Sequence, residues 1–383
     1  MNPAIIAVAY NRPDSLRRLL TSLDKAVYEN DVTLVISIDK ADNETEVLDV
    51  AEKFEWKYGK KIIRLFPERQ GLRKHIIQCG DLSNEYDAVI ILEDDLVVSK
   101  GFYTYMCSAL NFYVNEHQIT GISLYSHEWN GYAGKFFQPI VDEFDTYLGQ
   151  FSITWGQCWT SKWWNNFKKW YLEHEDKLGF NRLIPENINH WSCQSWGRYF
   201  VNYIVEKNLY YVIPRTSLST NFSEVGQHCQ NGNTDHQVKI LFSNKRNYNF
   251  APCESAQIYD IFFENMLIKK YLDKEIADEG IIVDLAGIGR YGEHKRYLLT
   301  TSILQYKIVR SFGLQMRPID LNVIYGINGN DIFLYDTTKE CKNKSDNFEN
   351  IVRYEIRGIP NRKLLKYIIE IIKERIFRQV KFK

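Results

Sequence analysis

The chain has 383 residues, long enough for two or three domains, and its 48 lysines and arginines balance its 48 aspartates and glutamates. Without a net positive charge it lacks the basic footprint of a general nucleic-acid binder, so no nucleic-acid partner is expected. No run approaches the roughly 18 apolar residues of a bilayer-spanning helix. The seven cysteines show no CxxC pair or metal-ligand spacing. The cysteine pattern and the lack of a long apolar run together favour a reduced, cytoplasmic protein.

The first 125 residues alternate strand-like apolar runs with helical patterns. Ala4–Ala9 is continuously apolar, and Pro13 is well placed to begin a helix. The apolar stripe of that helix consists of Leu16, Leu19, Leu20 and Leu23. Further strands are expected at 32–38, 61–66, 88–92 and 119–124, and further helices around 47–54, from residue 71 and around 102–112. This alternation predicts an α/β fold with a mostly parallel sheet and helices on both faces.

Charged side chains follow the expected strands at their carboxyl ends. They are Arg12, Asp39, Arg73, Glu93, Asp94 and Asp95. In a parallel sheet these ends meet at one edge, where open α/β folds bind ligands. Carboxylates crowded there suit Mg²⁺ or Mn²⁺, and guanidinium groups bind phosphate oxygens, so a metal-bound nucleoside diphosphate is expected. The alternative is an acidic turn that faces solvent.

The middle of the chain is rich in tryptophan. Seven of the nine tryptophans lie between residues 155 and 196. They indicate either a strongly aromatic core or a platform on which pyranose rings stack. A helix is expected at 196–207, a strand at 209–213, and a polar loop at 216–228.

Two features of the last hundred residues allow more than one interpretation. Residues 287–292 match GxGxxG after a strand-like run. This would indicate a nicotinamide-dependent oxidoreductase only if a helix opened on the motif, and a glycine-rich turn is the alternative. Residues 362–383 form a basic amphipathic helix, which suits either the surface of an anionic membrane or packing against the protein.

The chain resembles GT-A glycosyltransferases at several of these places. The segments that carry the resemblance are AIIAVAYNR at 4–12, ISID at 36–39, LEDDLVVSKGF at 92–102, GISL at 121–124 and the stretch 149–159. The resemblance covers about the first 230 residues. It is closest to the N-acetylglucosaminyltransferase that begins complex N-glycan assembly and to bacterial transferases of capsule and O-antigen loci.

The resemblance implies that a sugar is transferred, with inversion, from a UDP-linked nucleotide-sugar donor. The acceptor would be a saccharide or a lipid-linked saccharide. Asp95 would ligate Mn²⁺ or Mg²⁺, while Glu93 and Asp94 would meet sugar and ribose. The other expected donor ligands are Arg12 and Asp39 at the nucleotide, Arg73 at the diphosphate and His228 in a late loop that closes over it. A bacterial cytoplasmic enzyme, peripheral at the inner membrane face, fits best. The expected units are a nucleotide-sugar-binding half at 1–130, an acceptor-binding half at 131–275 and an accessory region at 276–383.

The catalytic base departs from the pattern of these relatives. Their base is an aspartate directly after a tryptophan, whereas Trp191 and Trp196 are followed here by Ser192 and Gly197. Two nearby groups are candidates to take the acceptor proton: Glu224 in the late loop, which is preferred, and His190. A sugar-nucleotide-binding protein without catalysis is the remaining alternative.

Overall fold

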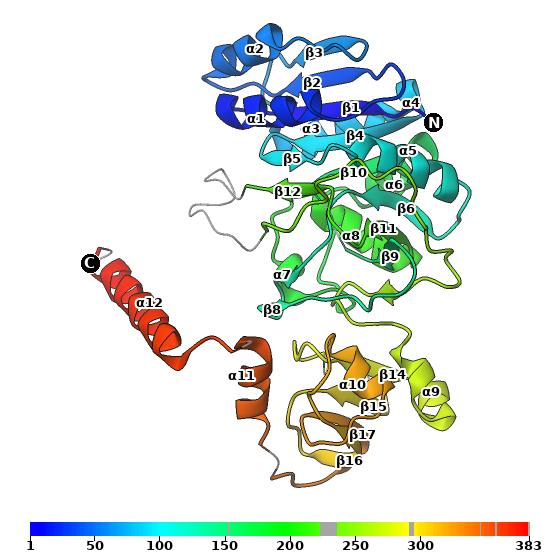
Figure 1. Cartoon of the computed structure of the whole chain (residues 1–383), viewed down its shortest axis with the longest axis vertical. Helices are drawn as coiled ribbons and strands as arrows, with labels where there is room; N and C mark the ends of the chain where they lie inside the picture. Colours follow the sequence, from blue (N-terminus) through cyan, green and yellow to red (C-terminus); the bar gives the residue numbers. More distant parts are fainter. Residues whose placement is uncertain (152–153, 223–235, 291–294, 345, 357, 382–383) are drawn as a thin grey trace.

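The computed structural model describes the chain except for residues 152–153, 223–235, 291–294, 345, 357 and 382–383 (Figure 1). Its centre is a nine-stranded sheet with the order β13-β9-β11-β6-β10-β4-β1-β2-β3. The strands are β1 (Ala4–Ala9), β2 (Leu34–Ile38), β3 (Lys61–Leu65), β4 (Ala88–Glu93), β6 (Ile119–Ser123), β9 (Thr146–Gly149), β10 (Gln157–Thr160), β11 (Tyr210–Pro214) and β13 (Ile258–Tyr259).

The first half of the sheet has the predicted arrangement. β3, β2, β1 and β4 are neighbours and all run parallel. The intervening helices are α1 (Pro13–Asp24), α2 (Glu44–Lys53), α3 (Gly71–Asp81), α4 (Ser83–Tyr86) and α5 (Phe102–Tyr113). The predicted α/β class with a mostly parallel sheet is therefore confirmed.

Three strands of this sheet were not predicted, namely β9, β10 and β13. β10 pairs antiparallel with β4 on one side and with β6 on the other. The parallel strands β3, β2, β1 and β4 are thus joined to the parallel pair β6 and β11 through a short reversed strand, and β9 pairs antiparallel with β11 beyond them. The sequence of β10, Gln157–Thr160, has no alternation from which a strand could be predicted.

Both faces of the sheet are covered by helices, and the side chains of β1 show how. Ile5 and Ala7 belong to a core that also contains Leu16 of α1, whereas Ala4 and Ile6 belong to a second core on the other face. The helices α6 (Ser161–His174), α7 (Glu186–Asn189) and α8 (Trp196–Lys207) follow in the second half of the chain. Because both faces of β1 are buried, its sequence is apolar throughout rather than alternating.

Most of the clustered tryptophans are core residues. Five of them have at most 4% of their surface exposed: Trp159, Trp163, Trp164, Trp170 and Trp196. The interpretation of the whole cluster as a sugar platform is therefore wrong, because these rings are covered by other side chains. Only Trp155 and Trp191 remain partly exposed.

A smaller α/β region follows the large sheet. Its four strands have the order β14-β15-β17-β16 and are β14 (Ile281–Asp284), β15 (Tyr297–Thr300), β16 (Tyr306–Phe312) and β17 (Ile332–Glu340). The helical segments are η1 (Ile268–Tyr271), α9 (Lys274–Glu279), α10 (Asp320–Ile324), α11 (Phe348–Ile356) and the terminal α12 (Asn361–Lys381).

The glycine motif at 287–292 lies between β14 and β15. Gly287 and Gly289 adopt positive φ angles of 71° and 93°. The backbone N–H groups of Ile288 and Gly289 donate to the carboxylate of Asp284 at 2.8 and 3.1 Å. Residues 285–290 form no helix, and the amides of Ile288 and Gly289 bind an internal acid instead of facing a ligand. The described part of the motif is a glycine-rich turn and lacks the helix that a dinucleotide site needs.

The terminal helix α12 extends away from the rest of the chain (Figure 1). Its exposed apolar side chains include Leu365, Tyr367, Ile368 and Ile372, which are 49–66% accessible. Among the described residues, no helix combines the length and the apolar content needed to cross a bilayer.

Candidate functional site

The predicted charged residues gather where β1, β2 and β4 end. Arg12 directly precedes α1, Asp39 follows β2, and Glu93 is the last residue of β4. β1 lies between β2 and β4 and runs parallel to both, so the carboxyl ends of all three strands meet at one edge. The sheet topology thereby brings together Arg12, Asp39 and the acidic cluster of Glu93, Asp94 and Asp95.

Arg12 neutralises two of the three acids. Its Nη2 donates a hydrogen bond to Asp94 Oδ1 and lies 3.2 Å from Asp95 Oδ2. Burial disfavours the charge on Arg12, but the two carboxylates outweigh it and raise the pKa of the guanidinium above its usual value. A quarter of the Arg12 side chain is still exposed, so the guanidinium can also face a ligand.

Glu93 carries the electrostatic consequence of this crowding. Burial, together with the charges of Asp95 and Asp94, raises the pKa of Glu93 from 4.5 to about 8, although Arg12 acts in the opposite direction. Three carboxylates at one strand end thus carry more negative charge than a single arginine neutralises. Additional positive charge at this edge would relieve the repulsion.

Asp95 has an oxygen suited to a metal ion. Its Oδ1 is buried and has no hydrogen-bond partner among the described residues. A buried carboxylate oxygen is rarely left without a partner, and oxygen is the ligand that Mg²⁺ and Mn²⁺ prefer. The described residues contain no group of three or more His, Cys, Asp or Glu arranged to hold a metal. The site therefore fits an ion bound by one carboxylate and completed by ligand phosphates, which is a common arrangement for Mg²⁺.

Asp39 orders the backbone beside this cluster. It is 3% exposed, and its carboxylate accepts from the backbone N–H groups of Gln70 at 2.7 Å and Gly71 at 2.9 Å. These are the first amides of α3, which the carboxylate caps from the end of β2. The structure therefore shows Asp39 supporting the loop before α3.

Arg73 points to a different part of the protein. Its Nη1 donates to Asp176 Oδ1, the carbonyl oxygen of Cys193 and the hydroxyl of Tyr199, at 2.8, 2.9 and 2.9 Å. Only 12% of its side chain is exposed. In the described structure these contacts connect α3 to the ends of α6 and α8. Arg73 would have to give them up to bind a diphosphate.

The segment after residue 218 lies beside Asp95. The strand β12 (Ser219–Asn221) pairs with β5 (Leu96–Val98), and Phe222 N–H donates to the carbonyl oxygen of Asp95 at 3.0 Å. The predicted base Glu224 and the predicted lid residue His228 follow, but both lie outside the described residues. Glu224 is therefore two residues along the chain from a direct contact with Asp95.

His190, the other candidate base, is exposed at the end of α7. Two acids in the middle of the chain, Asp142 and Asp145, are ion-paired with Arg215 and Lys245, both at 2.6 Å. Their carboxylates hold loops together, which makes them poor candidates for the base.

Sequence reasoning did not single out one aromatic group near β12. The Trp155 ring lies 4.7 Å from Tyr125, 5.7 Å from His127 and 4.5 Å from His236. The carbonyl oxygen of Trp155 accepts from Ser219 Oγ at 2.6 Å, which places this residue beside the strand that contacts Asp95. A partly exposed indole there is suited to stack on a sugar ring. Trp155 was hidden among the core tryptophans that surround it in the sequence.

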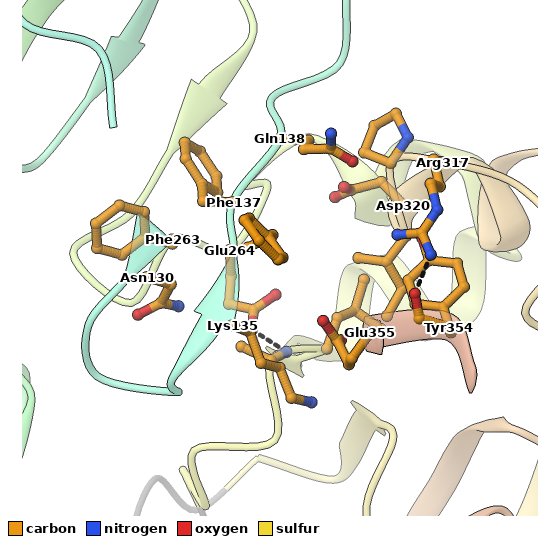
Figure 2. A pocket seen from close by; sticks show the side chains of 15 residues that line it. Asn130, Lys135, Phe137, Gln138, Phe263, Glu264, Arg317, Asp320, Tyr354 and Glu355 are labelled. Atoms are coloured by element: carbon orange, nitrogen blue, oxygen red, sulfur yellow. Dashed lines mark hydrogen bonds between the residues drawn. The ribbon is translucent and has the colours of Figure 1, made fainter. Parts of the chain in front are cut away.

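A cavity of about 60 Å³ lies between the large domain and the C-terminal region (Figure 2). Glu264 and Asp320 face it from different sides. Burial raises the pKa of Glu264 well above its usual value, and that of Asp320 from 3.8 to about 6. Glu264 accepts from the backbone N–H of Ala286 at 2.8 Å, so the acid also connects the two parts of the chain.

Comparisons with known proteins give distant likenesses only. No protein-family model and no curated protein sequence matches the chain. Among solved structures, TarS residues 1–349 of S. aureus with UDP-GlcNAc is similar at 13% identity and a TM-score of 0.37, over 60% of this chain and 60% of that chain. GalNAc-T7 with UDP, GalNAc and Mn²⁺ is similar at 10% identity and a TM-score of 0.39, over 56% and 43% of the two chains. Mouse xyloside xylosyltransferase 1 is similar at 12% identity and a TM-score of 0.35, over 55% and 84%. These scores are too low to establish a common fold by themselves, so the fold is assigned from the strand order.

Proposed function

We propose that the chain is a metal-dependent, inverting glycosyltransferase that uses a UDP-linked nucleotide-sugar donor. The observation that carries the proposal is the buried and unpartnered Oδ1 of Asp95, at the end of a fully buried central strand and beside Arg12. That combination suits a divalent ion bound together with a diphosphate. The resemblance of residues 92–102 to GT-A enzymes supports a sugar nucleotide as the ligand.

Different residues at this edge would bind different parts of the donor. Asp95 holds the ion, and the exposed part of Arg12 faces the phosphates while its other contacts keep Asp94 in place. Glu93 and Asp94 meet the sugar and the ribose. The bound ion would supply positive charge that stabilises the diphosphate as it leaves.

The proposal extends to the reaction as the resemblance implies it. The acceptor hydroxyl attacks the anomeric carbon of a hexosyl or N-acetylhexosaminyl donor, and Glu224 or His190 takes the hydroxyl proton. A saccharide acceptor in bacterial surface polysaccharide synthesis, at the cytoplasmic face, fits this reaction. The half-buried indole of Trp155 is proposed as a surface for one of the sugar rings.

Titration calorimetry with UDP, with and without Mn²⁺, tests the donor site. Wild-type protein should bind UDP more tightly with Mn²⁺, and Asp95→Asn should lose that gain, because an amide oxygen carries no charge. Asp49→Asn is a matched control, since Asp49 is an exposed carboxylate on α2 that pairs with Lys53. Equal Mn²⁺ dependence in wild type and Asp95→Asn would contradict the metal assignment. Release of UDP from a panel of UDP-sugars then distinguishes an enzyme from a protein that only binds the donor.

A further inference from the structure

A groove of about 560 Å³ runs along α1 between this helix, β5 and residues 240–242. We call it the α1 groove. Its volume lies in the range typical of sites that bind small organic ligands. None of the donor-site residues discussed above lines it.

Five of the residues that line the α1 groove are apolar, and we call them its floor: Val97, Val98, Ile240, Leu241 and Phe242. The Phe242 side chain is 84% exposed. The backbone around it is held in place, because Leu241 N–H donates to the carbonyl oxygen of Ser217 at 2.7 Å. An exposed phenyl ring on an ordered apolar floor is a surface on which a hydrocarbon group would be buried.

The charged residues that line the groove, which we call its rim, are mostly cationic. Four cationic side chains and one carboxylate belong to its lining: Arg17, Arg18, Lys25, Lys100 and Asp14. Asp14 is already ion-paired with Arg17. Lys25 and Lys100 are exposed, and the Lys100 ammonium lies 5.4 Å from the centre of the Phe242 ring. An apolar floor with a cationic rim is complementary to an amphiphile that carries an anionic group.

One end of the groove lies close to the donor site. Arg12 precedes α1 and contacts Asp94 and Asp95, and Arg18 follows on the same helix about 9 Å away at 1.5 Å per residue. The Arg18 guanidinium lies 3.9 Å from the centre of the Phe222 ring, and Phe222 N–H donates to the backbone carbonyl oxygen of Asp95. An acceptor sugar at the acidic cluster could therefore be attached to a group in the α1 groove.

We propose that the acceptor is a lipid-linked saccharide whose phosphate and adjoining hydrocarbon chain bind in the α1 groove. The inference rests on the proposed function and specifies its acceptor. The phosphate meets the basic rim, and the chain covers Val97, Leu241 and Phe242. A nucleic acid or a free phosphate would leave the apolar floor uncovered, whereas a plain hydrocarbon would not use the cations.

The lipid phosphate takes no part in the bond exchange. A sugar hydroxyl of the acceptor forms a bond to the anomeric carbon of the donor, and the bond from that carbon to the diphosphate oxygen breaks. The nucleoside diphosphate leaves with the electron pair, and the base accepts the hydroxyl proton. The groove acts by holding the acceptor at a fixed distance from the donor.

Titration calorimetry of the full chain with farnesyl phosphate, below its micelle concentration, tests the groove. Farnesol and inorganic phosphate are the partial probes and should bind far more weakly. The double variant Lys25→Glu with Lys100→Glu, and separately Phe242→Ser, should weaken farnesyl phosphate binding at least about tenfold. These side chains are exposed, so the variants should fold. Lys53→Glu, an exposed lysine on α2, is the matched control and should bind normally.

Binding of UDP with Mn²⁺ is measured on the same samples to separate the two proposals. Loss of farnesyl phosphate binding in the groove variants, with UDP binding unchanged, supports the inference. Wild-type protein that binds UDP with Mn²⁺ but not farnesyl phosphate overturns the inference and leaves the donor site standing. Absence of UDP binding overturns the proposed function itself. If vesicles containing anionic phospholipid bind through these side chains but monomeric farnesyl phosphate does not, the groove contacts a membrane surface and the acceptor assignment is wrong.

Discussion

Replacing Asp320 by asparagine should stabilise the protein above pH 6. Asp320 is 5% exposed, faces the cavity of Figure 2 and has its pKa raised by burial from 3.8 to about 6. Between pH 3.8 and about 6, the folded protein therefore retains a proton that the unfolded chain has released. This stability is fully present below the unfolded pKa of 3.8 and is lost as the pH rises through about 6. A change of about two pKa units corresponds to about 3 kcal/mol, which is an upper bound for the gain because asparagine is also costly to bury.

Thermal unfolding at pH 4, 6 and 8 measures the effect. The Tm of Asp320→Asn should exceed that of wild type by several degrees at pH 8 and by much less at pH 4. Other charged groups line the same cavity: Lys135, Glu264, Arg317 and Glu355. The pKa of Glu264 is also raised, so some pH dependence should remain in the variant. Asp278→Asn, an exposed acid on α9, is the control and should not change the profile. A difference in Tm that is independent of pH, or a lower Tm at pH 8, would refute the reasoning.

The remaining predictions concern catalysis and the terminal helix. Either Glu224→Gln or His190→Ala, but not both, should lower kcat at least about a hundredfold while UDP binding persists, because one of the two removes the acceptor proton. Normal turnover in both variants would place the base elsewhere. Deletion of residues 362–383 should abolish co-sedimentation with vesicles of anionic lipid at low salt, since each lysine or arginine near such a surface contributes about 1 kcal/mol. Full-length protein that never sediments with these vesicles would exclude the membrane contact.

Much of the first half of the fold could be predicted because its signals are local. The continuous apolar run of β1, Pro13 at the start of α1 and the leucine stripe that follows depend only on neighbouring residues. The acidic cluster after β4 could be placed at the sheet edge for the same reason. In a parallel sheet, every strand in the same direction brings its carboxyl end to the same side.

The roles of individual polar residues depended on contacts that are distant in the sequence. Arg73 was expected at a strand end like Arg12, but it lies in α3 and is bound by Asp176, Cys193 and Tyr199, more than a hundred residues away. Asp39 follows β2 as expected, and its oxygens are taken by the amides before α3. The position of a residue at a strand end predicts where its backbone lies, but not which partner its side chain contacts.

Packing decided which aromatic residues remain accessible. Trp155 and Trp159 have similar surroundings in the sequence, yet Trp159 is fully buried while Trp155 stays partly exposed beside β12. The α1 groove likewise arises only where α1, β5 and residues 240–242 come together. The sequence determines the period of each element and the residues at its ends. Which surfaces are covered depends on the pairing of distant segments, because burial is a property of the whole assembled chain.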